Sequence, residues 1–196
     1  IGRLAAGVAH EIGNPVTGIA CLAQNLREER EDDSELTEIS SQILEQTKRI
    51  SRIVQSLMSF AHAGSHQHND EPVCLAEVAQ DAIGLLALNR RNFEVQFYTL
   101  CDPDHWVDGD PQRLAQVLIN LLSNARDASP AGSAVRVKSE ASEHTVDLIV
   151  EDEGTGIPKN IIDRLFEPFF TTKDPGEGTG LGLALVYSIV EEHYGQ

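Results

Sequence analysis

Residues 116–128 read Gln-Val-Leu-Ile-Asn-Leu-Leu-Ser-Asn-Ala-Arg-Asp-Ala, and the spacing of their apolar positions predicts an amphipathic helix. At about 100° per residue, Asn120, Asn124 and Asp127 fall within roughly a 60° arc, while aliphatic side chains fill the opposite side. The polar face of this helix therefore carries two carboxamides and a carboxylate that point in similar directions.

A solvated helix face usually carries Lys and Glu, whereas amide oxygens suit a hard cation such as Mg²⁺ that is shared with phosphates. Taken alone, the segment is equally compatible with an ordinary amphipathic helix. Segments further along the chain decide between the two interpretations.

Two glycine-rich segments lie downstream of this helix. The first, Asp152-Glu153-Gly154-Thr155-Gly156, comes after a strand-like run; the second, Gly178-Thr179-Gly180-Leu181-Gly182, precedes an apolar helical stretch. Glycine lets the backbone approach a ligand closely, and a helix start offers free N–H groups to phosphate oxygens. A plain turn is the alternative for the first segment, and the second glycine cluster taken alone is weak evidence. A Walker loop is disfavoured because no Gly-Lys-Ser/Thr comes after either segment.

Between the glycine segments, residues 164–173 read Arg-Leu-Phe-Glu-Pro-Phe-Phe-Thr-Thr-Lys. We expect Phe166 to complete the core at a helix end. Lys173, with Thr172 beside it, lies in a loop next to the candidate phosphate-binding glycines and is well placed to contact a nucleotide.

These four segments, in this order, resemble the N, G1, F and G2 boxes of the Bergerat ATP-binding fold of gyrase, Hsp90, MutL and histidine kinases. Residues 166–170 and 178–183 are most similar to the sensor histidine kinase forms. The resemblance implies that Asn120 and Asn124 hold Mg²⁺ and that Asp152 accepts a hydrogen bond from the adenine amino group of ATP. The other implied nucleotide-binding residues are Asp127, Gly154, Gly156, Thr172, Lys173, Gly178, Thr179, Gly180, Leu181 and Gly182.

The amino-terminal stretch Ala-Ala-Gly-Val-Ala-His-Glu-Ile-Gly-Asn-Pro, residues 5–15, resembles the H box of the same family. A neutral imidazole is a nucleophile near physiological pH, so His10 is the expected phosphoacceptor, and Glu11 would hold the ring N–H. Asn14 lies one helical turn further on, and the resemblance implies that it positions the water that dephosphorylates a partner regulator. A zinc-protease motif is not formed, because the second His is lacking.

Apolar residues spaced by three, four or seven predict a long helical hairpin over residues 1–62, with a bend near Pro15, just after His10. Pairing two hairpins would give a dimeric four-helix bundle and therefore a homodimer; a hairpin packed on its own globular domain is the alternative. Residues 63–72 read as a linker, and residues 73–196 as the catalytic ATP-binding domain.

The predicted fold of residues 73–196 is an α/β sandwich with helices on one face of a mixed sheet. The expected strands are 73–75, 93–100, 106–107, 134–139 and 145–150, and the expected helices are 76–88, 111–128, 159–166 and 181–193. The resembling family continues beyond the G2 helix with two closing strands. This sequence stops at Gln196, so we expect those carboxyl-terminal strands to be missing from it.

The amino-acid composition limits the classes of partner and the compartment expected for this chain. A net charge of −16 and a pI near 4.7 argue against nucleic acid, whose binding needs basic surfaces. An odd number of cysteines, three, favours a reducing compartment. No apolar run approaches the ~20 residues of a membrane span, so no membrane contact is expected within this fragment. Because the chain begins at Ile1 rather than Met, in the middle of a predicted helix, we expect it to be a fragment. The resemblance implies that this fragment is the cytoplasmic portion of a membrane-anchored bacterial sensor kinase.

The resemblance implies Mg²⁺-dependent transfer of the ATP γ-phosphoryl group to His10, and then relay to an aspartate on the receiver domain of a response regulator. The short span 174–177 and the sequence His-Glu-Ile-Gly-Asn-Pro are most similar to the nitrogen-regulation class of sensor kinases. Two alternatives remain open: an ATP-driven conformational clamp without a phosphohistidine, and a scaffold that binds nucleotide as a structural ligand.

Overall fold

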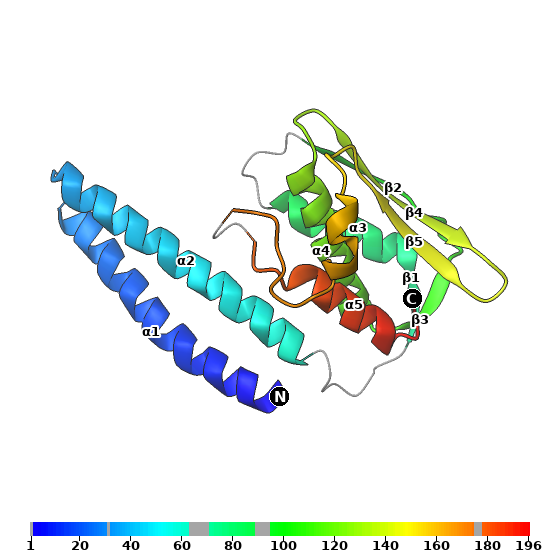
Figure 1. Cartoon of the computed structure of the whole chain (residues 1–196), viewed down its shortest axis with the longest axis horizontal. Helices are drawn as coiled ribbons and strands as arrows, with labels where there is room; N and C mark the ends of the chain where they lie inside the picture. The colour runs from blue at the N-terminus through cyan, green and yellow to red at the C-terminus, as the bar shows by residue number, and fades with distance from the viewer. Residues whose placement is uncertain (1, 31, 63–70, 89–94, 175–177) are drawn as a thin grey trace. The chain divides into compact units, whose positions relative to one another are not determined.

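The computed structural model describes residues 2–30, 32–62, 71–88, 95–174 and 178–196, which form the helices and strands labelled in Figure 1. The chain divides into two compact units. One contains residues 1–66 together with 168–181, and the other contains residues 67–167 together with 182–196.

The first unit contains the predicted helical hairpin, formed by α1 (Gly2–Glu29) and α2 (Ser34–His62). The acidic turn between them is held by Asp33, whose Oδ1 accepts hydrogen bonds from the backbone N–H groups of Glu35 and Leu36, each at 3.2 Å. This is an N-cap that satisfies amide groups at the start of α2. Helix α1 continues through Pro15, so the proline does not end it, and the bend expected there stays a prediction.

The seam between the two hairpin helices is narrow. Val16 and Ala23 of α1 and Leu44 of α2 are buried, together with the hydroxyls of Ser40 and Thr47. Ser40 donates to the carbonyl of Leu36 at 2.7 Å and Thr47 to that of Leu44 at 2.9 Å, so the buried hydroxyls are satisfied within their own helix.

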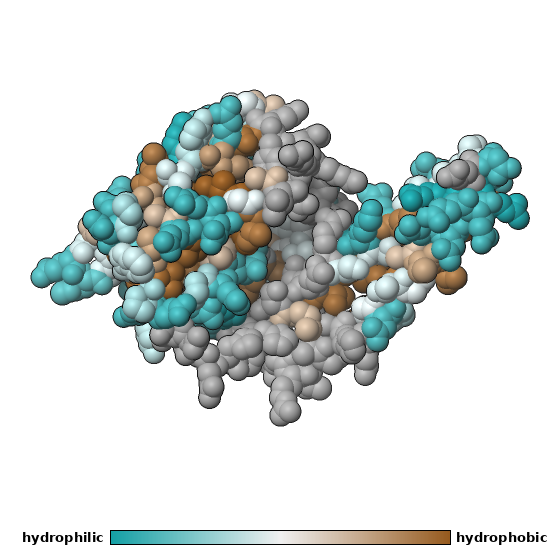
Figure 2. Space-filling view, turned by 180° about the vertical axis from the view of Figure 1, so that it is seen from behind, coloured by the Kyte–Doolittle hydropathy of each residue, from teal (hydrophilic) through white to brown (hydrophobic). Residues whose placement is uncertain are grey.

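Other large aliphatic side chains of the hairpin lie outside this seam and are exposed: Ile12, Ile19, Leu22, Leu26, Ile39, Ile50 and Ile53. We call this set the hairpin stripe. Figure 2 shows brown, apolar side chains along the hairpin between the teal, hydrophilic ones. The hairpin alone therefore does not cover the apolar positions that define its helices.

In the described part of the chain, the second unit has strands in two sheets. The antiparallel pair consists of β1 (Glu71–Cys74) and β3 (Trp106–Gly109), and the three-stranded sheet has the order β2 (Gln96–Leu100), β4 (Ala134–Ala141), β5 (Val146–Glu151). Strand β2 runs parallel to β4, with Tyr98 opposite Arg136, and β4 runs antiparallel to β5, with Val137 opposite Val150. The larger sheet is thus mixed, as predicted.

The helices of this unit are α3 (Leu75–Leu88), α4 (Pro111–Ala128) and α5 (Gly182–Glu192). Figure 1 shows α3 and α4 on one face of the three-stranded sheet, which confirms the predicted α/β arrangement. The helix expected over residues 159–166 is present as a 3₁₀ helix over Lys159–Arg164. The linker boundary was wrong, because Glu71 and Pro72, assigned to the linker, already belong to β1. Residues 63–70 of the predicted linker and residues 93–94 of the predicted second strand lie outside the described residues.

The core of this unit lies between the helices and the sheet. Strand β4 places Val135 and Val137 inside, both fully buried, while Arg136 and Lys138 point to the other face. Leu118 and Leu122 of α4 are also fully buried and belong to the same cluster. Among the described residues, no helix has the length and apolar character needed to cross a membrane.

The core position Leu118 gives a test of this packing. Leu118→Ala should lower the free energy of unfolding by about 3 kcal/mol, because it removes buried methyl groups and leaves a cavity. Trp106, the single tryptophan, lies in β3 and reports unfolding of this unit by fluorescence during urea titration. The matched control is Leu85→Ala in α3, whose side chain is 53% exposed and whose loss should cost less than about 0.5 kcal/mol. Equal losses in the two variants would contradict the core assignment.

Candidate nucleotide site

Helix α4 carries the predicted polar face. Asp110 caps its start, its Oδ1 accepting from the backbone N–H groups of Gln112 at 2.8 Å and Arg113 at 3.2 Å. The residues that α4 buries are Val117, Leu118, Leu122 and Ala125. The core contact therefore sets the rotation of the helix and turns its amide face away from the core. Asn120 and Asn124 are half-buried, and Asp127 is exposed.

Asn120 carries an unsatisfied polar atom. Its Nδ2 is buried and has no hydrogen-bond partner within the described part of the chain. A Cβ added at Gly182, the first residue of α5, would lie 3.6 Å from Asn120 Oδ1, so the amide stands against the start of that helix. A buried amide without a partner costs about 1–3 kcal/mol, and the two ends of an amide can exchange places. The position thus fits a residue that gains its partner from a bound ligand.

The carboxylate of Asp127 is already engaged. Its Oδ1 accepts from Arg126 Nη2 at 2.7 Å and Nε at 3.0 Å. Sequence reasoning placed Asp127 beside the two asparagines but missed its ion pair with Arg126, which is visible only in the structure. A ligand that contacts Asp127 would therefore meet the Arg126–Asp127 ion pair.

The glycine turn after β5 is tied to the end of α4. Asp152 Oδ1 accepts from the backbone N–H of Gly154 at 2.8 Å, which leaves the other lone pairs of this exposed carboxylate for further hydrogen bonds. A Cβ added at Gly154 would lie 2.7 Å from the carbonyl oxygen of Ala128, the last residue of α4. Gly156 has a φ of +73°, a conformation that favours glycine. These glycines therefore serve the shape of the turn itself.

The second glycine segment closes on the aromatic segment before it. The backbone N–H of Phe169 donates to the carbonyl of Gly180 at 2.8 Å, and both residues have positive φ, +68° and +66°. A Cβ at Gly180 would lie 2.3 Å from the carbonyl carbon of Phe169, and one at Gly178 would lie 2.4 Å from Thr171 Oγ1. Both glycines are thus required by local packing.

Other residues of this segment differ in burial. Thr172 is exposed, Lys173 is half-buried and Leu181 is almost fully buried. Thr179 Oγ1 accepts from the backbone N–H of Leu181 at 3.4 Å. Residues 168–181 belong to the first unit, whereas Gly182 and the α4 and β5 positions belong to the second. Within the second unit, the structure therefore brings Asn120 to Gly182 and Gly154 to Ala128, with Asp152 bonded to Gly154.

The predicted phosphoacceptor lies on α1. His10, Glu11 and Asn14 all fall within this helix, so His10 and Asn14 are one turn apart as predicted. Asn14 is exposed, and the side chains of His10 and Glu11 lie outside the described part of the structure.

Phe166 does not complete the core, which corrects the sequence-based prediction. It is 48% exposed, and its ring centroid lies 5.4 Å from that of Tyr187, which is exposed to the same extent. The 3₁₀ helix before it ends at Arg164, so the ring follows a helix end, as expected, but lies on the surface. Tyr187 also donates its hydroxyl to Glu191 Oε1 at 2.9 Å, and this bond to a carboxylate raises the pKa of the phenol above its usual range.

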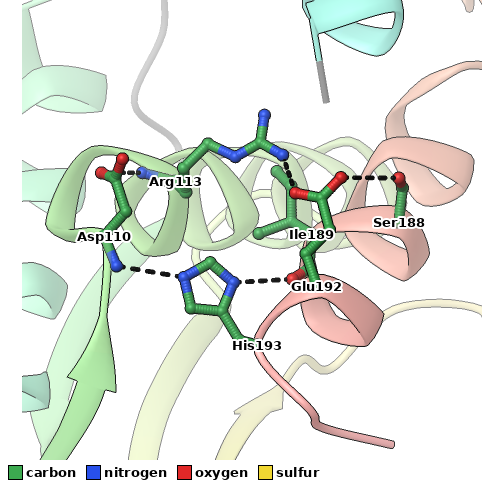
Figure 3. Close-up of polar contacts among 6 residues, drawn as sticks. All are labelled: Asp110, Arg113, Ser188, Ile189, Glu192 and His193. Carbon is green, nitrogen blue, oxygen red and sulfur yellow. Dashed lines mark hydrogen bonds and ion pairs between the residues drawn. The ribbon is translucent and has the colours of Figure 1, made fainter. Parts of the chain in front are cut away.

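Sequence reasoning also missed a polar cluster between α4 and α5, shown in Figure 3. His193 accepts a hydrogen bond from the backbone N–H of Asp110, and Arg113 forms an ion pair with Glu192. Nothing in the local sequence around residue 193 indicates a partner more than eighty positions earlier.

Gly154 gives a direct test of the turn. Gly154→Ala should lower the free energy of unfolding by about 1–3 kcal/mol, because the new Cβ meets the backbone of Ala128 and the Asp152 carboxylate. Gly84→Ala in α3 is the matched control. Nothing lies within 4 Å of its Cβ position, and this helical substitution should stabilise by about 0.5–1 kcal/mol. Opposite signs are expected by Trp106 fluorescence in urea, and a neutral Gly154→Ala would contradict the close approach.

Comparison with known proteins agrees with this geometry. Residues 1–66 match the family model of the His Kinase A (phospho-acceptor) domain, and residues 109–196 match that of histidine kinase-, DNA gyrase B- and HSP90-like ATPases. The sensor histidine kinase ZraS of Escherichia coli K12 is 36% identical over 203 residues. The match covers 100% of this chain and 41% of that protein, so the chain spans less than half of this relative.

Two solved structures are also similar. A mycobacterial sensor histidine kinase, MprB, has 32% identity and a TM-score of 0.57, covering 64% of this chain and 80% of that one. The histidine kinase ThkA, in complex with the response regulator protein TrrA, has 28% identity and a TM-score of 0.67, covering 99% of this chain and 55% of that one. Together with the two family models, these similarities show that the chain belongs to the sensor histidine kinases.

Proposed function

We propose that this chain binds ATP and Mg²⁺, transfers the γ-phosphoryl group to His10 and passes it to an aspartate of a response-regulator receiver domain. The observation that carries the proposal is the buried, unsatisfied amide of Asn120 beside the amino-terminal end of α5. A helix start offers N–H groups and positive potential to phosphate oxygens, and a neutral amide oxygen suits Mg²⁺. The start of α5 and the amide of Asn120 thus lie side by side in the second unit.

The proposed roles depend on the chemistry of each residue. Asn120 and Asn124 would hold Mg²⁺, which when bound neutralises charge on the phosphates, and Asp152 would accept from the adenine amino group. Asp127, Thr172 and Lys173 would contact the nucleotide through hydrogen bonds and charge. The glycines Gly154, Gly156, Gly178, Gly180 and Gly182, with Thr179 and Leu181, would shape the backbone around it. Because phosphoryl transfer depends mainly on positioning and electrostatics, this division needs no covalent chemistry from these groups.

On the hairpin, His10 is the proposed nucleophile, with Glu11 holding the ring N–H and stabilising the charge that develops on the imidazole. Asn14, exposed one turn along α1, would position the water for dephosphorylation of the regulator. The proposed division of labour assigns residues 1–62 to dimerisation and phosphotransfer, 63–72 to a linker, and 73–196 to nucleotide binding.

The complex of ThkA with the response regulator TrrA supports a regulator as the partner of this chain. Within the family, the spacing of residues 174–177 favours the nitrogen-regulation class, and residues 7–26 resemble the Pseudomonas CbrA sensor of carbon and nitrogen utilisation. We also propose that the chain is the cytoplasmic portion of a membrane-anchored sensor.

The uncovered hairpin stripe supports a homodimer. Its aliphatic side chains run along both helices and are exposed, Leu22 by 71%. Pairing with a second hairpin would bury them in a four-helix bundle, at about 25 cal/mol per Å² of apolar surface removed from water. The match to the phospho-acceptor domain model over residues 1–66 supports the same arrangement.

Incubation with γ-labelled ATP and Mg²⁺ tests the kinase. The chain should acquire acid-labile, base-stable label, and His10→Gln should acquire none. Asn120→Ala should lower labelling at least about tenfold, because loss of a group that holds the metal ion weakens its binding by that order. Label on His10→Gln would contradict the phosphoacceptor assignment. Nucleotide binding without any label would favour the clamp or the scaffold.

The same labelling reaction, followed by transfer to a receiver domain, tests whether Asn14 acts in dephosphorylation rather than in phosphorylation. Asn14→Ala should still acquire label and transfer it to a receiver domain, but should lose dephosphorylation of that domain. An unchanged dephosphorylation rate would remove Asn14 from the mechanism.

Sedimentation analysis tests the dimer. Leu22→Glu should convert a dimer to a monomer, because two copies of a carboxylate would be buried in the bundle without partners. Leu85→Glu, at an exposed position of α3, should leave the dimer intact. A Leu22→Glu chain that stays dimeric would show that the stripe does not form the interface.

A further inference from the structure

The polar cluster between α4 and α5 lies away from the candidate ligand groups. We name it the α4–α5 clasp, and it consists of Asp110, Arg113, Glu192 and His193 (Figure 3). His193 Nε2 accepts from the backbone N–H of Asp110 at 3.1 Å, and Nδ1 lies 2.7 Å from the carbonyl oxygen of Ile189. A carbonyl oxygen can only accept, so Nδ1 carries the proton and Nε2 is the acceptor. The ring is thus held from both sides.

The clasp is closely packed. A Cβ added at Gly109 would lie 2.6 Å from Cδ2 and 3.0 Å from Nε2 of His193, so the imidazole rests where a side chain would not fit. The Arg113–Glu192 ion pair is mostly shielded, with side chains 16% and 19% exposed, and Ser188 donates to Glu192 at 3.5 Å. Shielding from water makes these contacts stronger and more directional than surface pairs.

The clasp joins the carboxyl-terminal end of α5 to the amino-terminal end of α4. From Asp110 to Asn120 the rise along α4 is about 15 Å, and from His193 back to Gly182 along α5 it is about 17 Å. The two helices therefore run antiparallel, with the clasp at one end and the Asn120–Gly182 contact at the other. A slide of one residue would shift α5 by about 1.5 Å, which a hydrogen bond at the clasp does not tolerate.

We propose that His193 is a positioning residue for nucleotide binding. Through Asp110, it holds α5 in the register that sets Gly182 and the helix start against Asn120. The inference rests on the proposed function, because the group that it positions is the candidate nucleotide site. His193 acts on this site through the placement of α5 and not by touching the ligand.

Titration calorimetry with a non-hydrolysable ATP analogue and Mg²⁺ tests this inference on the whole chain. His193→Leu should weaken binding about tenfold or more, the size of loss that follows removal of an outer-shell hydrogen bond at metal sites. His193→Gln should restore most of the affinity, because its Oε1 can accept from Asp110 N–H. Gly109→Ala should weaken binding without altering the sequence of α5, because its Cβ displaces the imidazole.

The matched control is His105→Leu. His105 is half-buried in the same unit, and its ring Nδ1 lies 2.8 Å from Ser139 Oγ of β4 rather than from a residue of α4 or α5. Its loss should reduce stability, measured by Trp106 fluorescence in urea, but leave nucleotide affinity unchanged. If His193 had a purely structural role, His193→Leu would likewise lower stability and leave nucleotide affinity unchanged.

The outcomes are distinct. Weakened binding in His193→Leu and Gly109→Ala, with recovery in His193→Gln and none of this in His105→Leu, supports the positioning role. Unchanged affinity in a folded His193→Leu or Gly109→Ala overturns it while leaving the proposed function intact. Absence of binding by the unaltered chain overturns the proposed function and, with it, this inference.

Discussion

The packing of α4 on the three-stranded sheet is the contact on which the candidate site depends. Leu118 and Leu122 are fully buried in the same cluster as Val135 and Val137 of β4. Burial of one face of a helix fixes its rotation, and this rotation turns Asn120 and Asn124 away from the core. The apolar packing of α4 therefore sets the position of the amide groups, and no further interaction is needed to orient them.

Packing also explains why the first glycine segment lies where it does. The backbone at Gly154 meets the carbonyl of Ala128 so closely that a side chain would clash, which ties the turn after β5 to the end of α4. Asp152 then uses one carboxylate oxygen to hold this turn through Gly154 N–H. The backbone contact between Gly154 and Ala128 thus places the Asp152 carboxylate without the help of a ligand.

The sequence predicted the elements whose signals are local. The hairpin and α4 have long apolar periodicities, and the strands of the mixed sheet alternate in the way that a half-covered sheet requires. Phe166 was placed wrongly because an aromatic at a helix end is equally consistent with a core and with a surface ring pair, as it forms with Tyr187. The bond between His193 and Asp110 spans residues far apart in the chain, and no periodicity encodes such a pairing.

The choice of asparagine at position 120 has a physical reason of its own. The side chain is half-buried, and its Nδ2 lacks a partner in the described part of the chain. A carboxylate at this depth would add the cost of burying a charge, several kcal/mol without a cation beside it, whereas an unsatisfied amide costs about 1–3 kcal/mol. In a chain whose net charge is already −16, a further acid would also repel its neighbours. A neutral amide therefore lets α4 fold at a lower cost than a carboxylate would, and because its two ends can exchange places, either its oxygen or its N–H₂ group can face a ligand.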